Sequence, residues 1–172
     1  GGKVQEVVPV KVGFRKVEIS GSQLLLNGQP VLIKGVDRHE MDPDGGYVVS
    51  EERMMADMEV MKRYNINAVR TSHYPNDRRW YDMCDLYGIY VVAEANLESH
   101  GMGYGEESLA RRPDFAKTHL ERNSRNVQRN FNHPSVIVWS LGNEAGDGPN
   151  FDACYDWVKR EDPSRPVQYE RA

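Results

Sequence analysis

An acidic residue follows a buried-looking apolar run near the end of the sequence, in a position that suits proton transfer. The apolar residues 136–139 lead through Ser140, Leu141 and Gly142 to Asn143 and Glu144. A carboxyl group at the rim of an apolar core loses part of its hydration, and this favours the protonated form that a general acid needs. The position of Glu144 therefore predicts a proton donor.

Polar residues also follow three earlier apolar runs. They are of types that bind sugars or metal ions: Asp37, Arg38, His39 and Glu40 after the first run; Arg70, Thr71, Ser72, His73 and Tyr74 after the second; Glu94, Asn96, Glu98 and His100 after the third. In a parallel βα fold the functional groups collect where the strands end, so we expect these side chains to lie together. His119, inside a helical stretch, and His133, before Pro134, are expected at the surface or in caps.

Two of these residues could hold a metal ion together with Glu144. Glu98 and His100 are two positions apart on a segment expected to be extended, which projects both to the same side. Carboxylates with one imidazole, completed by water, suit Mg²⁺ better than a structural zinc. The alternative is a hydrogen-bonded histidine–carboxylate pair without a metal.

The elements that must position these groups form a βα pattern. Short β-branched runs predict five strands, at residues 31–36, 67–70, 89–93, 136–139 and 166–169. The runs near 89–93 and 136–139 are almost wholly apolar, which is typical of a parallel sheet covered by helices. Four helices are expected between the strands, with these apolar stripes: Met54, Met58 and Met61 after a cap at Ser50; Trp80, Met83, Cys84 and Tyr87 before Gly88; Leu120, Ser124, Val127 and Phe131 after Pro113; Phe151, Cys154, Tyr155 and Val158.

The fold class is therefore α/β, and the pattern fits an open doubly wound sheet or a (β/α)8 TIM barrel. A full barrel needs about 250 residues, so a barrel here would be its N-terminal half. Residues 1–30 differ, because runs 8–12, 17–19 and 24–30 alternate like antiparallel strands and Asn27-Gly28 marks a hairpin. We expect residues 1–30 to end a preceding β domain and residues 31–172 to form a truncated barrel domain.

Composition narrows the class of partner. The formal net charge is −4, and Lys and Arg are interspersed with Asp and Glu, so a nucleic-acid partner is not expected. No apolar run approaches the roughly 20 residues that span a bilayer, so no membrane partner is expected either. Cys84 and Cys154 lack metal-site spacing and are expected in the core. The expected partner is a small neutral molecule, and a soluble location in cytoplasm or periplasm stays open.

Four segments of the sequence together resemble glycoside hydrolase family 2. They are Gly35-Val36-Asp37-Arg38-His39-Glu40; Asn67-Ala68-Val69-Arg70-Thr71-Ser72-His73-Tyr74-Pro75-Asn76; Asn96-Leu97-Glu98-Ser99-His100-Gly101; and residues 132–144, which end in Gly142-Asn143-Glu144. The β-glucuronidases of this family share the Arg-Thr-Ser-His-Tyr-Pro and Asn-Glu runs but not the Asn-x-Glu-x-His-Gly segment. The resemblance therefore favours the β-galactosidases.

The resemblance implies a catalytic (β/α)8 barrel behind an immunoglobulin-like sandwich, and a retaining double displacement on terminal β-D-galactosides with a Mg²⁺ cofactor. It also implies roles for single residues: Glu144 as acid/base, Asn143 as a donor to the sugar 2-hydroxyl, His39 and His73 as galactose ligands, Arg70 as a support for the nucleophile, and Glu98, His100 and Glu144 as metal ligands. Ala145 stands where the family commonly has Ser, a change expected to be mild.

No carboxylate in the sequence is expected to serve as the nucleophile, which must lie about 5 to 5.5 Å from the acid. Glu94 is inside a strand, Glu98 is better used as a ligand, and Glu170 is close to the chain end. The resemblance places the nucleophile after a later barrel strand, so we expect the chain alone to be inactive. The alternatives are a β-glucuronidase or another family 2 glycosidase, such as one acting on mannosides, and a structural fragment that self-associates, for example as a homo-oligomer.

Overall fold

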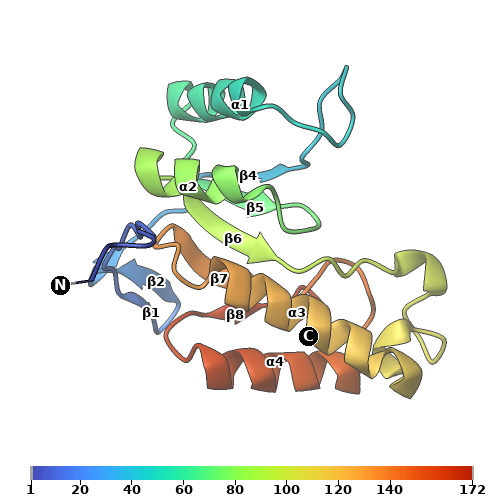
Figure 1. The fold of residues 1–172 in the computed structure, drawn as a ribbon. Coiled ribbons are helices and arrows are strands. Elements are labelled where there is room, and N and C mark those ends of the chain that lie inside the picture. Colours follow the sequence, from blue (N-terminus) through green and yellow to red (C-terminus); the bar gives the residue numbers. More distant parts are fainter. Residues whose placement is uncertain (1, 172) are drawn as a thin grey trace.

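The computed structural model describes residues 2–171, which form two separate β-sheets and four α-helices (Figure 1). The first sheet is antiparallel, with the order β1-β2-β3. Its strands are β1 (Val17–Ser20), β2 (Gln23–Leu26) and β3 (Gln29–Pro30). Asn27 and Gly28 between β2 and β3 have φ values of 50° and 78°, as a tight hairpin turn requires. The predicted hairpin is confirmed.

The strand expected at residues 8–12 is wrong. These residues form no strand, and Val8, Val10 and Val12 are exposed. Alternating valines favour an extended chain, but a strand also needs an edge to pair with, and no neighbouring strand among residues 2–171 supplies one to this segment.

The second sheet is parallel throughout, and the four α-helices connect its strands. Its strands follow the chain in the order β4 (Gly35–Arg38), β5 (Ala68–Thr71), β6 (Tyr90–Glu94), β7 (Val136–Ser140) and β8 (Val167–Gln168). Sequential parallel order with a helix in each crossover is the arrangement of the first half of a TIM barrel. The predicted α/β class is confirmed.

The first parallel strand begins later than predicted. Residues 31–34 lie outside β4 because the Asn67 side chain takes the place of a strand partner. Its Oδ1 accepts from the Lys34 backbone N–H at 2.7 Å, and its Nδ2 donates to the Leu32 carbonyl at 2.9 Å. A side chain that satisfies the backbone in this way ends the ladder locally.

Four helices connect the parallel strands. They are α1 (Glu51–Arg63), α2 (Arg78–Tyr87), α3 (Ala116–Asn130) and α4 (Pro149–Glu161). As predicted, Ser50 caps α1 by accepting from the Arg53 N–H, and Gly88 ends α2 with φ 69°. The helices cover the sheet, and α3 and α4 lie side by side (Figure 1). The core between helices and sheet is centred on Trp80, Tyr81 and Trp139.

Some predicted buried faces are wrong. Tyr87, Phe131 and Tyr155 are exposed in part. Val127 of the predicted α3 stripe is buried as expected, but the other buried residues of α3 are His119, Asn123, Asn126 and Asn130. These asparagines are buried because their amides are hydrogen-bonded: two of them donate to carbonyl groups at the ends of β6 and β7, and Asn130 donates to Asn126 Oδ1. Asn123 donates to Leu141 O and Asn126 donates to Ala93 O, and a hydrogen-bonded amide can be buried at low cost. Pro113 starts the 3-10 helix η3 (Pro113–Phe115), which leads directly into α3.

His119 is likewise not the surface or capping residue that the sequence predicts. Its ring is buried against Phe151, with ring centroids 5.1 Å apart, and its Nδ1 bonds to the Phe115 carbonyl. Burial lowers the pKa of His119, because the charged ring would lose its hydration. Within residues 2–171, no helix combines the length and the apolar character needed to cross a membrane.

Candidate active site

Polar residues at the carboxyl ends of β5, β6 and β7 meet through one guanidinium group. Arg70 Nε donates to Glu94 Oε2 at 2.5 Å, and Arg70 Nη2 donates to Asn143 Oδ1 at 2.8 Å. On the β4 side, Asp37 Oδ1 lies 3.5 Å from Arg70 Nη1. The expected gathering of strand-end residues therefore exists, with Arg70 at its centre.

Glu94 is the residue that the sequence argument undervalued. It is the last residue of β6, its side chain is fully buried, and three donors surround its carboxylate. Besides Arg70, these are Ser140 Oγ at 2.6 Å and His73 Nδ1 at 2.7 Å. The signal that could have identified it is its place as the final residue of an apolar strand, one step beyond Ala93, where side chains turn toward the functional edge.

The two histidines assigned to sugar binding lie next to each other. The rings of His39 and His73 meet edge to face with centroids 5.2 Å apart, and His39 also lies 6.1 Å from the Tyr74 ring. His39 is exposed, whereas the His73 side chain is only 17% exposed and is held by Glu94. This pair therefore borders the Arg70 group on its open side.

Arg38 and Glu40, from the same predicted set, do not join this site. Arg38 is buried over the Trp80 ring at 3.9 Å and donates to Asp57 and Asn76. Glu40 accepts from the Asp77 N–H at the start of α2. Both residues fasten helices to the sheet.

The turn after β7 presents Asn143 and Glu144. Asn143 Nδ2 donates to Glu98 Oε1 at 2.9 Å, and the Asn143 N–H donates to the Leu97 carbonyl. Glu144 has φ 40°, in the left-handed region that costs a non-glycine residue of order 1–3 kcal/mol. Its N–H donates to Glu170 Oε1 at 2.5 Å. Backbone strain at this position points to a functional role for the residue.

Glu144 is more open to solvent than its position after a buried strand suggests. Its side chain is 49% exposed among the residues described, so the protein does not enclose the carboxyl group on all sides. The apolar run of β7 ends at Ser140, and the turn carries Glu144 outward from the core.

The loop around Glu144 is fixed on both sides. Before it, a Cβ on Gly142 would lie 2.7 Å from the Leu97 carbonyl oxygen, so the close approach of the two segments requires glycine. After it, Tyr169 Oη accepts from the Ala145 N–H at 3.1 Å and donates to the Gly146 carbonyl. Burial raises the pKa of Tyr169, which keeps the hydroxyl proton available for that bond.

The three residues assigned to the metal converge loosely. His100 Nδ1 lies 3.6 Å from Glu98 Oε1 and 3.8 Å from Glu144 Oε2, and all three side chains are partly exposed. Their ligand atoms do not all fall within 4.8 Å of one another. His100 also starts a 3-10 helix, η1 (His100–Met102), so it is not on the extended segment that the spacing argument assumed. Two carboxylates and an imidazole around one space still form a donor set that suits a hard divalent cation.

The described residues contain one tighter group of metal-ligand types, Asp82, Asp85 and His133, at the other end of the strands. Asp85 already accepts from His133 Nδ1 at 2.6 Å and from the Ser135 N–H at 2.9 Å. This pair holds the start of β7 against α2.

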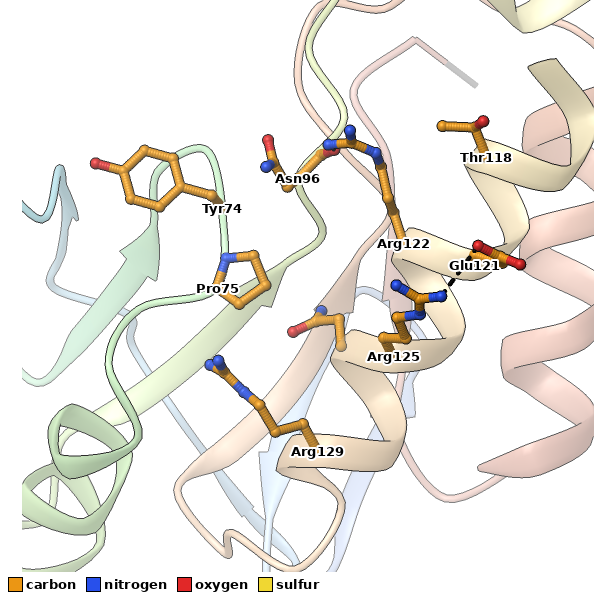
Figure 2. A pocket seen from close by; sticks show the side chains of 9 residues that line it. Tyr74, Pro75, Asn96, Thr118, Glu121, Arg122, Arg125 and Arg129 are labelled. Atoms are coloured by element: carbon orange, nitrogen blue, oxygen red, sulfur yellow. Dashed lines mark hydrogen bonds and ion pairs between the residues drawn. The ribbon is translucent and has the colours of Figure 1, made fainter. Parts of the chain in front are cut away.

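A cavity of about 640 Å³ opens beside the site but is not part of it (Figure 2). Three arginines of α3 line it, facing Tyr74, Pro75 and Asn96. Each arginine already has an acceptor: Arg122 bonds to Asn96 O, Arg125 to Glu121, and Arg129 to Asn76 O. The bonds of Arg122 and Arg129 tie α3 to the loops after β6 and β5, and the bond of Arg125 stays within α3, so the arginines are explained without a ligand.

Fold and site together define the class of the chain as a barrel-type α/β domain with a polar cluster at its strand ends. The chain belongs to a known family of this class, because the family described as "Glycosyl hydrolases family 2, TIM barrel domain" matches residues 17–172. Family 2 is a family of glycoside hydrolases, as the sequence resemblance predicted.

Individual relatives agree with this assignment. The chain is 56% identical over 169 residues to a "Beta-galactosidase" of Pectobacterium atrosepticum, a match that covers 98% of this chain and 16% of that protein. It is 57% identical over 159 residues to a "Beta-galactosidase" of Vibrio vulnificus, covering 92% of this chain and 15% of that protein. The chain thus spans about a sixth of the length of these relatives.

Solved structures that resemble the fold are named for a different activity. A β-glucuronidase of Ruminococcus gnavus superposes with a TM-score of 0.82 at 32% identity, covering 92% of this chain and 28% of that one. A β-D-glucuronidase of Dictyoglomus thermophilum gives a TM-score of 0.79 at 32% identity, covering 91% of this chain and 28% of that one.

Proposed function

We propose that the protein to which this chain belongs hydrolyses terminal β-D-galactosides with retention of configuration. The observation that carries the proposal is the joined Arg70, Asn143 and Glu98 network, which holds the turn bearing Glu144 at the ends of the parallel strands. The identity of more than half to proteins named β-galactosidase supports galactose as the sugar.

In this proposal Glu144 protonates the glycosidic oxygen and later removes a proton from the attacking water. Its partial exposure is consistent with that double role, because both the leaving group and the water must reach it. Asn143 lies beside it and binds the sugar 2-hydroxyl, while His39 and His73 bind further hydroxyls from the β4 and β5 side. Arg70 positions both Asn143 and the nucleophile.

Glu98, His100 and Glu144 would hold Mg²⁺, whose charge would stabilise the ionised form of the acid/base residue when the metal is bound. Glu98 is anchored for this by the amide of Asn143, and His100 reaches toward both carboxylates.

The nucleophile lies outside residues 2–171 in this proposal. Glu94 is enclosed by three donors with no exposed surface, so it cannot reach a sugar carbon. Glu98 is committed to Asn143, and Glu170 accepts from the backbone of Glu144. The remaining strands of the barrel would supply the missing carboxylate.

A β-glucuronidase is the second candidate, and it is favoured by the similar solved structures. The two sugars differ at C6, where a glucuronide carries a carboxylate and a galactoside a hydroxyl, and at C4, where the hydroxyl is equatorial in the glucuronide and axial in the galactoside. Comparing the full-length enzyme on chromogenic β-galactoside, β-glucuronide and β-mannoside tests the proposal directly. A kcat/KM that is highest for the galactoside supports it, and a preference for another sugar overturns it.

Self-association is the remaining proposal for the chain by itself. β4 and β8 are the outer strands of the parallel sheet, and Leu32 and Ile33 before β4 and Val36 within it are exposed. Such edges invite pairing with the rest of the barrel or with a second copy. Sedimentation of the chain decides this, since a well-behaved monomer contradicts self-association.

A further inference from the structure

The buried carboxylate of Glu94 is bound from three directions. Its Oε2 accepts from Arg70 Nε and from Ser140 Oγ, and its Oε1 faces His73 Nδ1 at 2.7 Å. Its own N–H donates to Thr71 Oγ1 at 2.9 Å, which fixes the backbone below the carboxylate. A fully buried carboxylate is stable only when paired and hydrogen-bonded, and Glu94 meets both conditions.

The third donor is itself oriented by a neighbour. Gln168 Nε2 donates to Ser140 Oγ at 2.6 Å, so that oxygen already accepts a hydrogen bond and its single proton is directed to Glu94. Arg70 has no acceptor capacity at all. Both partners of Oε2 are therefore donors, and Oε2 acts only as an acceptor.

An acceptor at Nδ1 decides which nitrogen of His73 carries the proton. In a neutral imidazole one nitrogen donates and the other accepts, so a proton on Nδ1 leaves a free lone pair on Nε2. The His73 side chain is 17% exposed, and its ring meets the exposed ring of His39 edge to face. Because Glu94 occupies Nδ1, Nε2 is the nitrogen that remains to accept a hydrogen bond from a ligand.

We propose that Glu94 is a positioning residue that sets the tautomer of His73, so that His73 Nε2 accepts a hydrogen bond from one hydroxyl of the bound sugar. This inference rests on the proposed function and deepens it. It assigns a hydrogen-bond direction to His73 and gives the fully buried Glu94 a part in specificity although it does not touch the sugar.

The test uses the full-length enzyme and the inhibition constants of non-hydrolysed thio-β-galactosides in which single hydroxyls are replaced by hydrogen or by fluorine. Neither hydrogen nor fluorine can donate a hydrogen bond. At the hydroxyl that binds His73, both replacements should therefore weaken binding of the analogue to the wild type by the same factor. For that hydroxyl, loss of the bond should raise the inhibition constant of the wild type about 5- to 100-fold.

Glu94→Gln should reverse the direction of the bond to that one hydroxyl, because the Gln amide can donate to Nδ1 and leave the proton on Nε2. The hydroxyl would then accept from Nε2, and fluorine can accept weakly whereas hydrogen cannot, so in this variant the fluoro compound should bind more tightly than the deoxy compound, while the other hydroxyls keep their effects. If this variant does not fold, Glu94→Asp replaces it, since that change keeps the charge beside Arg70 but withdraws the carboxylate from His73.

Asp162→Asn is the matched control. Asp162 is also buried, and it accepts from Arg165 Nη1 at 2.5 Å and from Trp139 Nε1 at 2.8 Å, away from the strand-end site. A merely structural role for Glu94 would make its variants resemble this control, with weaker binding of all analogues alike, and that result overturns the inference. A fluoro analogue that binds like the parent also overturns it.

Failure of the proposed function has a different signature. A matching thio-β-glucuronide series is run in parallel, and an enzyme that binds only this series is no galactosidase. The dependence on single hydroxyls is then judged on the glucuronides, where a fluoro compound that binds more tightly than its deoxy counterpart only in Glu94→Gln still supports the assignment of His73, and a uniform loss of binding still refutes it.

Discussion

Arg70 and Asn143, which are far apart in the sequence, are joined by a hydrogen bond of 2.8 Å between Nη2 and Oδ1. The same guanidinium holds Glu94 through Nε, so one side chain connects the ends of β5, β6 and the turn after β7. Burial would lower the pKa of Arg70, but the hydrogen bond and charge of Glu94 outweigh it and raise that pKa. Arg70 is therefore a permanent cation that sets the spacing of the site.

Arg70→Lys should lower kcat/KM of the full-length enzyme although the charge is kept. A lysine has no planar fork and cannot bond Glu94 and Asn143 together. Loss of one charged hydrogen bond costs about 1.5–3 kcal/mol, so a fall of about 10- to 150-fold is expected. Arg53→Lys, at a partly exposed pair with Asp42, is the control and should leave the kinetics unchanged. Equal activity of both variants would show that the fork is not needed.

Glu144→Gln should reduce kcat by about 10²- to 10⁴-fold, the usual contribution of general acid–base catalysis. The substitution keeps the size of the side chain and the unusual φ of 40°, so folding should be preserved. Steady-state kinetics with a poor leaving group shows the effect best, because such a substrate depends most on protonation. Asp147→Asn, on the same loop and exposed, serves as the comparison. An unchanged kcat would remove Glu144 from the role.

The fold was predictable because its signals are local. Apolar strands, Met54, Met58 and Met61 on one face of α1, and a glycine stop after α2 each reflect backbone and burial preferences within a few residues. The errors came where distant groups intervene. Residues 31–34 do not form the predicted strand, because the Asn67 side chain bonds to their backbone. The buried face of α3 is mostly polar, because carbonyl groups of the sheet lie opposite it and accept hydrogen bonds from its asparagines.

The site was predictable in membership but not in its connections. Strand-end position brought Arg70, His73 and Asn143 together correctly, since that rule depends only on topology. Glu94 was set aside as a strand residue, because its three donors come from elsewhere in the sequence. The exposure of Glu144 was also missed, since a one-residue turn decides whether a side chain points into a core or away from it.

Gly142→Ala should destabilise the protein, because its Cβ would lie 2.7 Å from the Leu97 carbonyl oxygen and 2.9 Å from Leu97 Cβ. Neither atom is the end of a flexible side chain, so the loop must shift, at a cost of about 1–3 kcal/mol in the free energy of unfolding. Denaturation in urea measures this. Gly101→Ala, where a Cβ would meet nothing within 4 Å, should change stability by less than about 0.5 kcal/mol. Equal stability of the two variants would contradict the close approach.

Removal of divalent cations should lower activity of the full-length enzyme, and Mg²⁺ should restore it. Glu98→Gln weakens the proposed donor set while its side chain can still accept from Asn143, so the Mg²⁺ concentration for half-maximal activity should rise about 10-fold or more. Asp85→Asn, in the group with Asp82 and His133, should leave that concentration unchanged. If a chelator of divalent cations leaves the activity unchanged, Mg²⁺ is not a cofactor of this enzyme.

Protonation of Asp162 should lower the free energy of unfolding as the pH is reduced from about 4 to about 2. Burial alone would raise the pKa of Asp162, but hydrogen bonds from Ser164, Arg165 and Trp139 hold it at about 2. A folded pKa below the unfolded value of about 3.9 means that the contribution is complete above pH 4 and is lost as the pH drops through 2; its size is about 2 kcal/mol.

Asp162→Asn separates this contribution from that of other carboxylates that titrate in the same window, among them Asp42 and Asp77, whose pKa values are also lowered to about 2. The variant leaves Arg165 buried without its charge partner, so it should be clearly less stable than the wild type at pH 7. The gap between the two free energies of unfolding should narrow toward pH 2, as Asp162 takes up its proton. A gap that stays constant across this range would mean that the pKa of Asp162 is the same in the folded and unfolded states, and it would contradict the prediction.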